Sequence, residues 1–273
     1  MSTRKRRWIP ILIALSWILA GATAPAVAVD SFTLWNSLLE RHVVLIDGGY
    51  ASRVDYGGMQ RDRAQLNVYT RQLSATTPAQ FSALDRADQI AFLINAYNAF
   101  TVQLILTRWP NLESIKDLGG LFSNPWHQRF FTLLGQPMDL DQIEAMLREP
   151  GRYDDPRIHF AINCASIGCP MLQPHAYDGG QLDRQLQAAA ARFIGDRTRN
   201  RYDQDQDTVQ LSKIFDWYAA DFRRGPDHSV TGVLARYAVE LSDDPNIQWR
   251  IRRQQIDVKY ASYDWRLNAV KAR

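Results

Sequence analysis

The chain has 273 residues, with 32 lysines and arginines against 29 aspartates and glutamates, for a formal net charge of +3. Four of the basic residues lie in the first 28 positions, which hold no acidic residue, so the remaining 245 residues carry −1. A nucleic-acid partner is therefore excluded, because it requires a basic face on the folded part. Eight Trp, eleven Tyr and eleven Phe supply enough apolar surface for one well-packed domain.

The N-terminus has the pattern of a secretory signal peptide over residues 1–28. A basic start, Arg4 to Arg7, precedes an apolar run from Trp8 to Leu19. Small residues follow and end in Ala26-Val27-Ala28, the type of site that signal peptidase cleaves. The alternative is an uncleaved anchor, although the apolar stretch is at the short limit for a membrane span. We expect cleavage after Ala28, a periplasmic or secreted protein, and no stable membrane association of the mature chain.

The first half of the mature chain reads as helices. We expect helices over 31–44 and 56–73, the second mostly polar and therefore at the surface, and a short helix that Thr77-Pro78 opens. The strongest helical pattern runs from Asp85 to Arg108. Its apolar residues cover more than one face, which is typical of a helix at the centre of a core. Trp109-Pro110 ends it, since the residue before proline disfavours helix.

The second half mixes helices with short strands. Residues 129–139 predict a strand, a turn and a second strand, and Asp139 or Asp141 caps a helix that ends near Arg148. The pattern over 157–163 fits a strand or a helix equally. We also expect helices over 180–194, 211–222 and 229–241, and strands over 207–211 and 256–263.

These elements predict an α+β fold, a mainly helical single domain with a small β-sheet. No linker or repeat divides the mature chain. Within it we expect a helical extension over 29–84 that packs on a core at 85–195, and a C-terminal part at 196–273 that belongs to the same unit.

The segment from His159 to His175 concentrates the residues best suited to chemistry near neutral pH. It contains both cysteines, Cys164 and Cys169, and two of the five histidines. Within a strand His159 and Cys164 would point to opposite faces, and within a helix they would lie roughly 140° apart. A direct His159–Cys164 pair therefore requires Cys164 to lie beyond the regular element, in a turn that Ala165 to Gly168 can form.

Four interpretations of this segment remain open. Cys164 and Cys169 form a structural disulfide, as an exported protein with an even cysteine count favours. One cysteine is a nucleophile with His159 or His175 as its base. The two cysteines are a reversible dithiol, although the spacing is wider than C-x-x-C. The two cysteines and two histidines bind zinc, although the spacing differs from that of known fingers. We predict no metal and no cofactor.

Asn95 and Asn98 lie three residues apart on the central helix and so share one side of it. Buried amides must be hydrogen-bonded. The pair therefore either clamps neighbouring loops or faces a substrate.

Three sequence blocks resemble domain-of-unknown-function family 547 (DUF547). They are Phe-Leu-Ile-Asn95-Ala-Tyr97-Asn98-Ala, Asp155-Pro-Arg-Ile-His159 through Cys164-Ala-Ser166-Ile-Gly-Cys169-Pro170, and Leu211-Ser-Lys-Ile-Phe-Asp-Trp-Tyr; the ending from Tyr263 to Asn268 is also similar. The resemblance implies that eight residues belong to the family's motifs: Asn95, Tyr97, Asn98, His159, Cys164, Ser166, Cys169 and Pro170. It implies no established reaction. Some relatives carry glutaredoxin-like modules, which favours thiol-related biology.

The order of elements also resembles papain-like and transglutaminase-like hydrolases, in which a cysteine at the start of a helix faces a histidine on a strand. Here a strand would begin at His159, but the helix has no cysteine, and Cys164 would have to replace it. The leading hypothesis is a thiol-dependent acyl transferase or hydrolase with catalytic residues Cys164, His159, His175, Asn95 and Asn98, acting on an unidentified small molecule or peptide. The alternative is a non-enzymatic binding or scaffold protein of the cell envelope with a structural Cys164–Cys169 disulfide.

Overall fold

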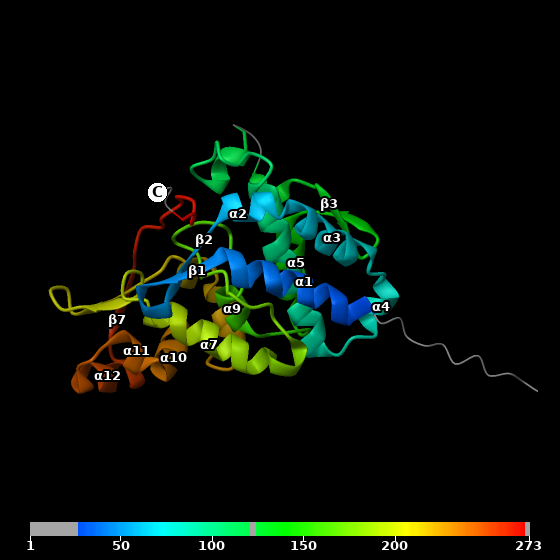
Figure 1. Ribbon diagram of the computed structural model, residues 1–273. Coiled ribbons are helices and arrows are strands. Elements are labelled where there is room, and N and C mark those ends of the chain that lie inside the picture. The colour runs from blue at the N-terminus through cyan, green and yellow to red at the C-terminus, as the bar shows by residue number, and fades with distance from the viewer. Residues whose placement is uncertain (1–26, 121–123, 271–273) are drawn as a thin grey trace, which may run out of the picture.

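The predicted central helix is confirmed. In the computed structural model, which describes residues 27–120 and 124–270, α5 runs Arg86–Ile105, and the side chain of Asp85 caps its N-terminus. Fourteen of its residues are buried, on all sides of the helix. Helices α3 and α6 pack against α5, and α1 packs against α3 (Figure 1).

Helices make up 52% of the structure and strands 13%, which confirms the α+β prediction. The predicted signal peptide lies outside the described residues, except for its last two positions. The helices of the described residues are α1 Val27–His42, α2 Tyr56–Arg61, α3 Arg63–Ala75, α4 Pro78–Ser82, α5, α6 Leu140–Leu147, α7 Leu182–Gly195, α8 Ile214–Trp217, α9 Ala219–Arg224, α10 Val230–Arg236, α11 Ala238–Leu241 and α12 Pro245–Arg252.

Seven short strands form three small sheets in the described residues. Two are antiparallel hairpins, and in the third the central strand β6 pairs antiparallel with β5 and parallel with β7. The strands are β1 Val43–Ile46, β2 Ala51–Val54, β3 Phe131–Leu133, β4 Gln136–Met138, β5 Arg201–Asp203, β6 Thr208–Leu211 and β7 Asp257–Tyr260.

Buried apolar side chains form two clusters. The larger surrounds α5 and draws on residues from α1 to α7. The smaller is rich in phenylalanine and joins α7 to β6 and α8–α12. In it Phe160 packs among the rings of Phe193, Phe215 and Phe222. Phe160 therefore ties the segment that precedes the cysteines to the C-terminal helices.

Several elements differ from their prediction. The helices expected over 56–73, 211–222 and 229–241 are each divided, with breaks at Asp62, Tyr218 and Tyr237. The possible strand at His159 is instead a 3₁₀ helix, η4 Pro156–Phe160, because Asp155 caps its start and Pro156 occupies its first turn. The histidine strand on which the analogy to papain-like hydrolases depended is therefore absent.

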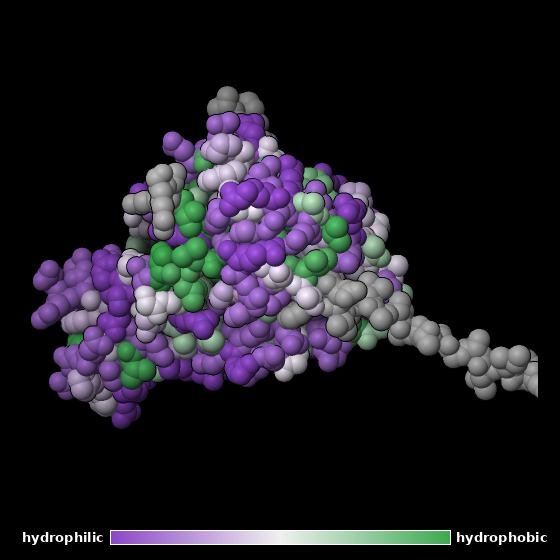
Figure 2. Space-filling view, in the orientation of Figure 1, coloured by the Kyte–Doolittle hydropathy of each residue, from purple (hydrophilic) through white to green (hydrophobic). Residues whose placement is uncertain are grey.

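Exposed apolar residues include Val44 and Leu45 of the β1–β2 hairpin, each about half exposed, and Figure 2 shows an apolar area over this hairpin. This hairpin was not predicted. Among the described residues, no helix combines the length and the apolar character that crossing a membrane requires.

Candidate functional site

A cavity of about 350 Å³ opens beside the two cysteines. Residues from α5, α6, η4, the cysteine turn, α8 and the C-terminal segment meet there. Its lining among the described residues consists of Tyr97, Asn124, Trp126, Asp141, Glu144, His159, Ile162, Cys164, Cys169, Pro170, Ile214, Trp217, Tyr218, Tyr263 and Trp265. The cavity has the size of a small-molecule site.

Cys164 and Cys169 form a disulfide across a tight turn, with their Cα atoms 6.0 Å apart. The predicted disulfide is thus present in the structure. Asn163 holds the turn closed: its side-chain amide donates to the Pro170 carbonyl at 2.6 Å, and its side-chain oxygen accepts from the Ala165 N–H at 3.0 Å. Ala165 adopts a left-handed conformation, with φ of 62°, which reverses the chain direction.

The two sulfur atoms differ in exposure. Cys169 is buried, and its Sγ accepts from the Cys164 backbone N–H at 2.8 Å. Cys164 is partly exposed, and its Sγ lies 3.1 Å from the Ser166 hydroxyl and 3.2 Å from the Tyr263 hydroxyl. The Ser166 hydroxyl donates to the Tyr263 oxygen at 3.0 Å, which leaves the Tyr263 hydroxyl free to donate to this sulfur. Such donation stabilises a thiolate after reduction.

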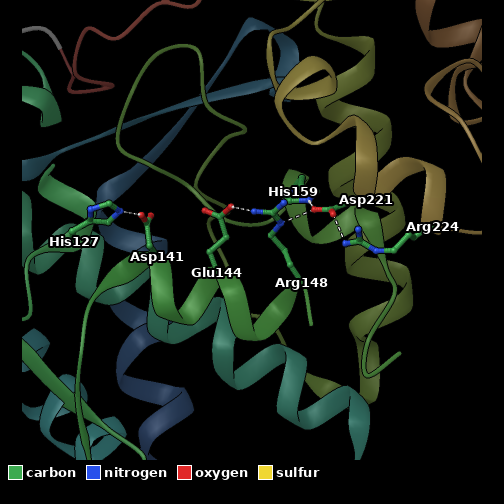
Figure 3. Close-up of polar contacts among 7 residues, drawn as sticks. All are labelled: His127, Asp141, Glu144, Arg148, His159, Asp221 and Arg224. Carbon is green, nitrogen blue, oxygen red and sulfur yellow. Dashed lines mark hydrogen bonds and ion pairs between the residues drawn. The ribbon is translucent and has the colours of Figure 1, made fainter. Parts of the chain in front are cut away.

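His159 is fully buried in the cavity wall and is oriented by a carboxylate. Its Nε2 lies 2.8 Å from Oδ2 of Asp221 (Figure 3). Its ring stacks on Tyr218 with 3.8 Å between the ring centres. The other ring nitrogen, Nδ1, has no hydrogen-bond partner. Burial lowers the pKa of His159, so the ring is neutral near pH 7 and donates its Nε2 proton to Asp221. Nδ1 is then a free proton acceptor.

Asp221 connects His159 to two arginines. Arg148 Nε donates to Asp221 Oδ2 at 2.6 Å, and Arg224 pairs with Oδ1. Burial alone would raise the pKa of Asp221, but the hydrogen bonds from His159 and Arg148 hold it well below its usual range. Asp221 is therefore a permanent carboxylate at neutral pH, which fixes the tautomer of the imidazole.

Two further carboxyl groups line the cavity from α6. Burial raises the pKa of Glu144, and the Tyr218 hydroxyl and Arg148, whose Nη1 lies 3.4 Å from Glu144 Oε1, offset this only in part. Burial also raises the pKa of Asp141, against the opposing effect of His127. Figure 3 shows the charged and polar side chains of the site in a row, with His127 at one end and Arg224 at the other.

The structure brings together only some of the predicted site residues. His159, Cys164 and Cys169 line the cavity. His175 is exposed at the surface, with Nδ1 3.3 Å from Glu40 Oε1, and is not among the lining residues.

Asn95 and Asn98 also lie outside the cavity lining. In each of them the side-chain nitrogen and the side-chain oxygen are both hydrogen-bonded to backbone groups. Asn95 exchanges two hydrogen bonds with the backbone of Tyr177. Asn98 donates to the Ala161 carbonyl at 3.0 Å and accepts from the Asn163 N–H at 2.8 Å. Both amides therefore act as clamps on loops, and Asn98 fixes the approach to the cysteine turn.

Three residues of the cavity region were not predicted as site residues: Asp221, Glu144 and Asp141. Asp221 follows the block Leu211-Ser-Lys-Ile-Phe-Asp-Trp-Tyr, so its place next to a motif was the one available signal. Within the described part of the chain, no group of three or more His, Cys, Asp or Glu side chains is arranged to hold a metal ion. The zinc interpretation also loses both sulfur ligands to the disulfide.

Residues 81–194 match the family model of DUF547, described as a protein of unknown function. This match confirms the resemblance of the motif blocks. It spans α5, the cysteine turn and most of α7, and therefore includes His159, Cys164 and Glu144 but ends before Asp221 and Tyr263. No curated protein and no solved structure matches the chain.

Proposed function

We propose that this DUF547 protein is a thiol-dependent acyl transferase or hydrolase, in which reduced Cys164 is the nucleophile and His159, oriented by Asp221, is the base. One observation carries the proposal: a buried imidazole with a free Nδ1, held by a carboxylate through its other nitrogen, lines the same cavity as a partly exposed cysteine. Nucleophile, base and orienting group are the parts that nucleophilic catalysis requires.

In the proposed reaction His159 Nδ1 takes the proton of the Cys164 thiol, and the thiolate attacks a substrate carbonyl carbon. The leaving group departs with that proton, which leaves a thioester on Cys164 and a neutral imidazole. Water or a second nucleophile then attacks the thioester with His159 again as base. Donation from Tyr263, whose oxygen accepts from Ser166, to Cys164 Sγ favours the thiolate before the attack.

The disulfide is the inactive form in this scheme, so Cys164 must first be reduced by a dithiol. We also propose that the protein is exported and works in the periplasm or outside the cell, as the signal-like N-terminus indicates. N-terminal sequencing of the protein from a native envelope fraction tests this, because cleavage after Ala28 leaves Val29 as the first residue.

The decisive experiment uses Cys169→Ser, in which Cys164 is the sole cysteine and stays free. Incubation with p-nitrophenyl acetate should add one acetyl group at Cys164, measured by intact and peptide mass spectrometry. His159→Gln in the same background should slow acetylation by about 10²-fold or more, the usual contribution of a general base. Cys164→Ser and the urea-unfolded Cys169→Ser protein are the controls.

A binding or scaffold protein is the second candidate, favoured by the fact that both cysteines are bonded to each other. If folded Cys169→Ser is acetylated no faster than its unfolded form, and His159→Gln changes nothing, the thiol mechanism is refuted. The cavity is then a binding site with a structural disulfide in its wall.

A further inference from the structure

The cavity lining has an unusual balance of charge. Two carboxyl groups line it, whereas no lysine or arginine does in the part of the chain that the structure describes. The imidazole in the wall is neutral, because burial lowers its pKa. A ligand group with positive charge would therefore meet no like charge in the lining.

Aromatic rings form another part of the wall. Trp265 lies at the centre of a continuous cluster, with ring-centre distances of 4.5 Å to Tyr263, 5.7 Å to Trp217 and 5.9 Å to Trp126. Ring faces attract cations through their quadrupole. One cation of the chain already uses this property, since Lys116 Nζ lies 3.7 Å from the ring centre of Trp265.

Asp141 pairs with the exposed His127, whereas Glu144 is not fully compensated from within the protein. Arg148 is held close to Asp221, at 2.6 Å, and is more distant from Glu144, at 3.4 Å. Glu144 is buried, and burial raises its pKa. His159 Nδ1, in a side chain buried in the same wall, is also without a partner. Buried polar groups that lack full hydrogen-bond or charge partners indicate that a ligand completes the site.

We propose that the cavity binds an alkylammonium group, with Glu144 and Asp141 supplying negative charge and the cluster of Trp126, Trp217, Tyr263 and Trp265 supplying ring faces. One part of this inference rests on the proposed function, namely the identity of the substrate. If Cys164 is the nucleophile, the substrate is an acyl compound or an acyl acceptor that carries an alkylammonium group. The binding itself does not require a free thiol.

The test compares choline with its uncharged analogue 3,3-dimethylbutan-1-ol, using the full chain with its disulfide intact. Isothermal titration calorimetry should detect choline binding, and the alcohol should bind at least about tenfold more weakly, since it lacks the charge that rings and carboxylates recognise. Equal affinity for the two compounds, or no binding of choline, would overturn the proposal.

Matched variants locate the binding. Glu144→Gln and Asp141→Asn should each weaken choline binding by at least about fivefold, and Trp217→Leu should act similarly. Glu149→Gln and Trp249→Leu change an exposed carboxylate and an exposed tryptophan outside the lining, and should leave the affinity unchanged. Circular dichroism shows which variants are folded, and two independent carboxylate variants keep the test decisive if one of them is not. Equal losses in the control variants would contradict the assignment.

Failure of this inference is distinguishable from failure of the proposed function. Choline binding is measured on the chain with its disulfide intact, and acetylation on Cys169→Ser, so each claim has its own readout. Acetylation of Cys164 without choline binding refutes the cation site alone. Choline binding without acetylation of Cys169→Ser refutes the thiol mechanism alone.

Discussion

Asn98→Ala tests whether the family-motif amide is a clamp or a substrate contact. The side chain is buried, and its two hydrogen bonds reach the carbonyl of Ala161 and the N–H of Asn163. Alanine leaves both backbone groups buried without these partners. An unsatisfied buried group costs about 1–3 kcal/mol, so the free energy of unfolding should fall by about 2–5 kcal/mol.

That loss is large against the total stability of a domain, which is typically about 5–15 kcal/mol. For a chain of this length a loss of 3 kcal/mol lowers the melting temperature by roughly 6–12 °C. Urea unfolding followed by circular dichroism measures the change. Asn246→Ala, an exposed position on α12, is the matched control and should change stability by less than about 0.5 kcal/mol.

The opposite result would refute this reasoning. If Asn98→Ala unfolds at the same urea concentration as Asn246→Ala, the two backbone bonds contribute nothing. If it also loses choline binding or acetylation at unchanged stability, Asn98 contacts the ligand, and the interpretation of its amide as a loop clamp is wrong.

Three further predictions follow from the site. Replacing both cysteines by serine should cost about 2 kcal/mol of unfolding free energy, because the disulfide closes a short loop; a loss above about 5 kcal/mol in urea unfolding would contradict this. Gly168→Ala should cost about 1–3 kcal/mol, since a Cβ there would lie 2.9 Å from the Tyr263 ring; unchanged stability would mean that Tyr263 moves freely. Burial lowers the pKa of His159 in the folded chain, so below about pH 6.5 the unfolded chain protonates this residue more readily than the folded chain does. The free energy of unfolding therefore falls as the pH falls. His159→Gln should therefore show a weaker decline in unfolding free energy from about pH 7 to 5, and an identical slope would refute the burial effect.

Local patterns were sufficient for the elements that depend on local interactions. The central helix followed from apolar residues on more than one face, and α6 followed from Asp139, which caps it in a complete capping box. The cysteine turn followed from spacing and small residues. The β1–β2 hairpin was missed although Asp47-Gly48 between two short runs is a typical hairpin signal.

The composition of the site was beyond local patterns because its partners are distant in sequence. His159 finds Asp221 across 62 positions, and Cys164 finds Tyr263 across 99. No periodicity encodes such pairs. Conversely, closeness in sequence does not imply closeness in space. His175 is near Cys169 in sequence, yet it lies at the surface beside Glu40.

The C-terminal segment links the disulfide to the aromatic wall. The backbone N–H groups of Ile167 and Gly168 donate to the carbonyls of Arg266 and Asp264, each at 2.8 Å, and the Asn268 N–H donates to Ala165 at 3.0 Å. The same segment supplies Tyr263 and Trp265 to the cavity. Because these three backbone bonds do not involve sulfur, they remain when the disulfide is reduced. The cysteine turn should therefore keep its shape, with Cys164 beside Tyr263. Under the proposed function, only the Cys164 side chain then has to turn, away from Cys169 and toward His159, which limits the reorganisation that precedes the attack.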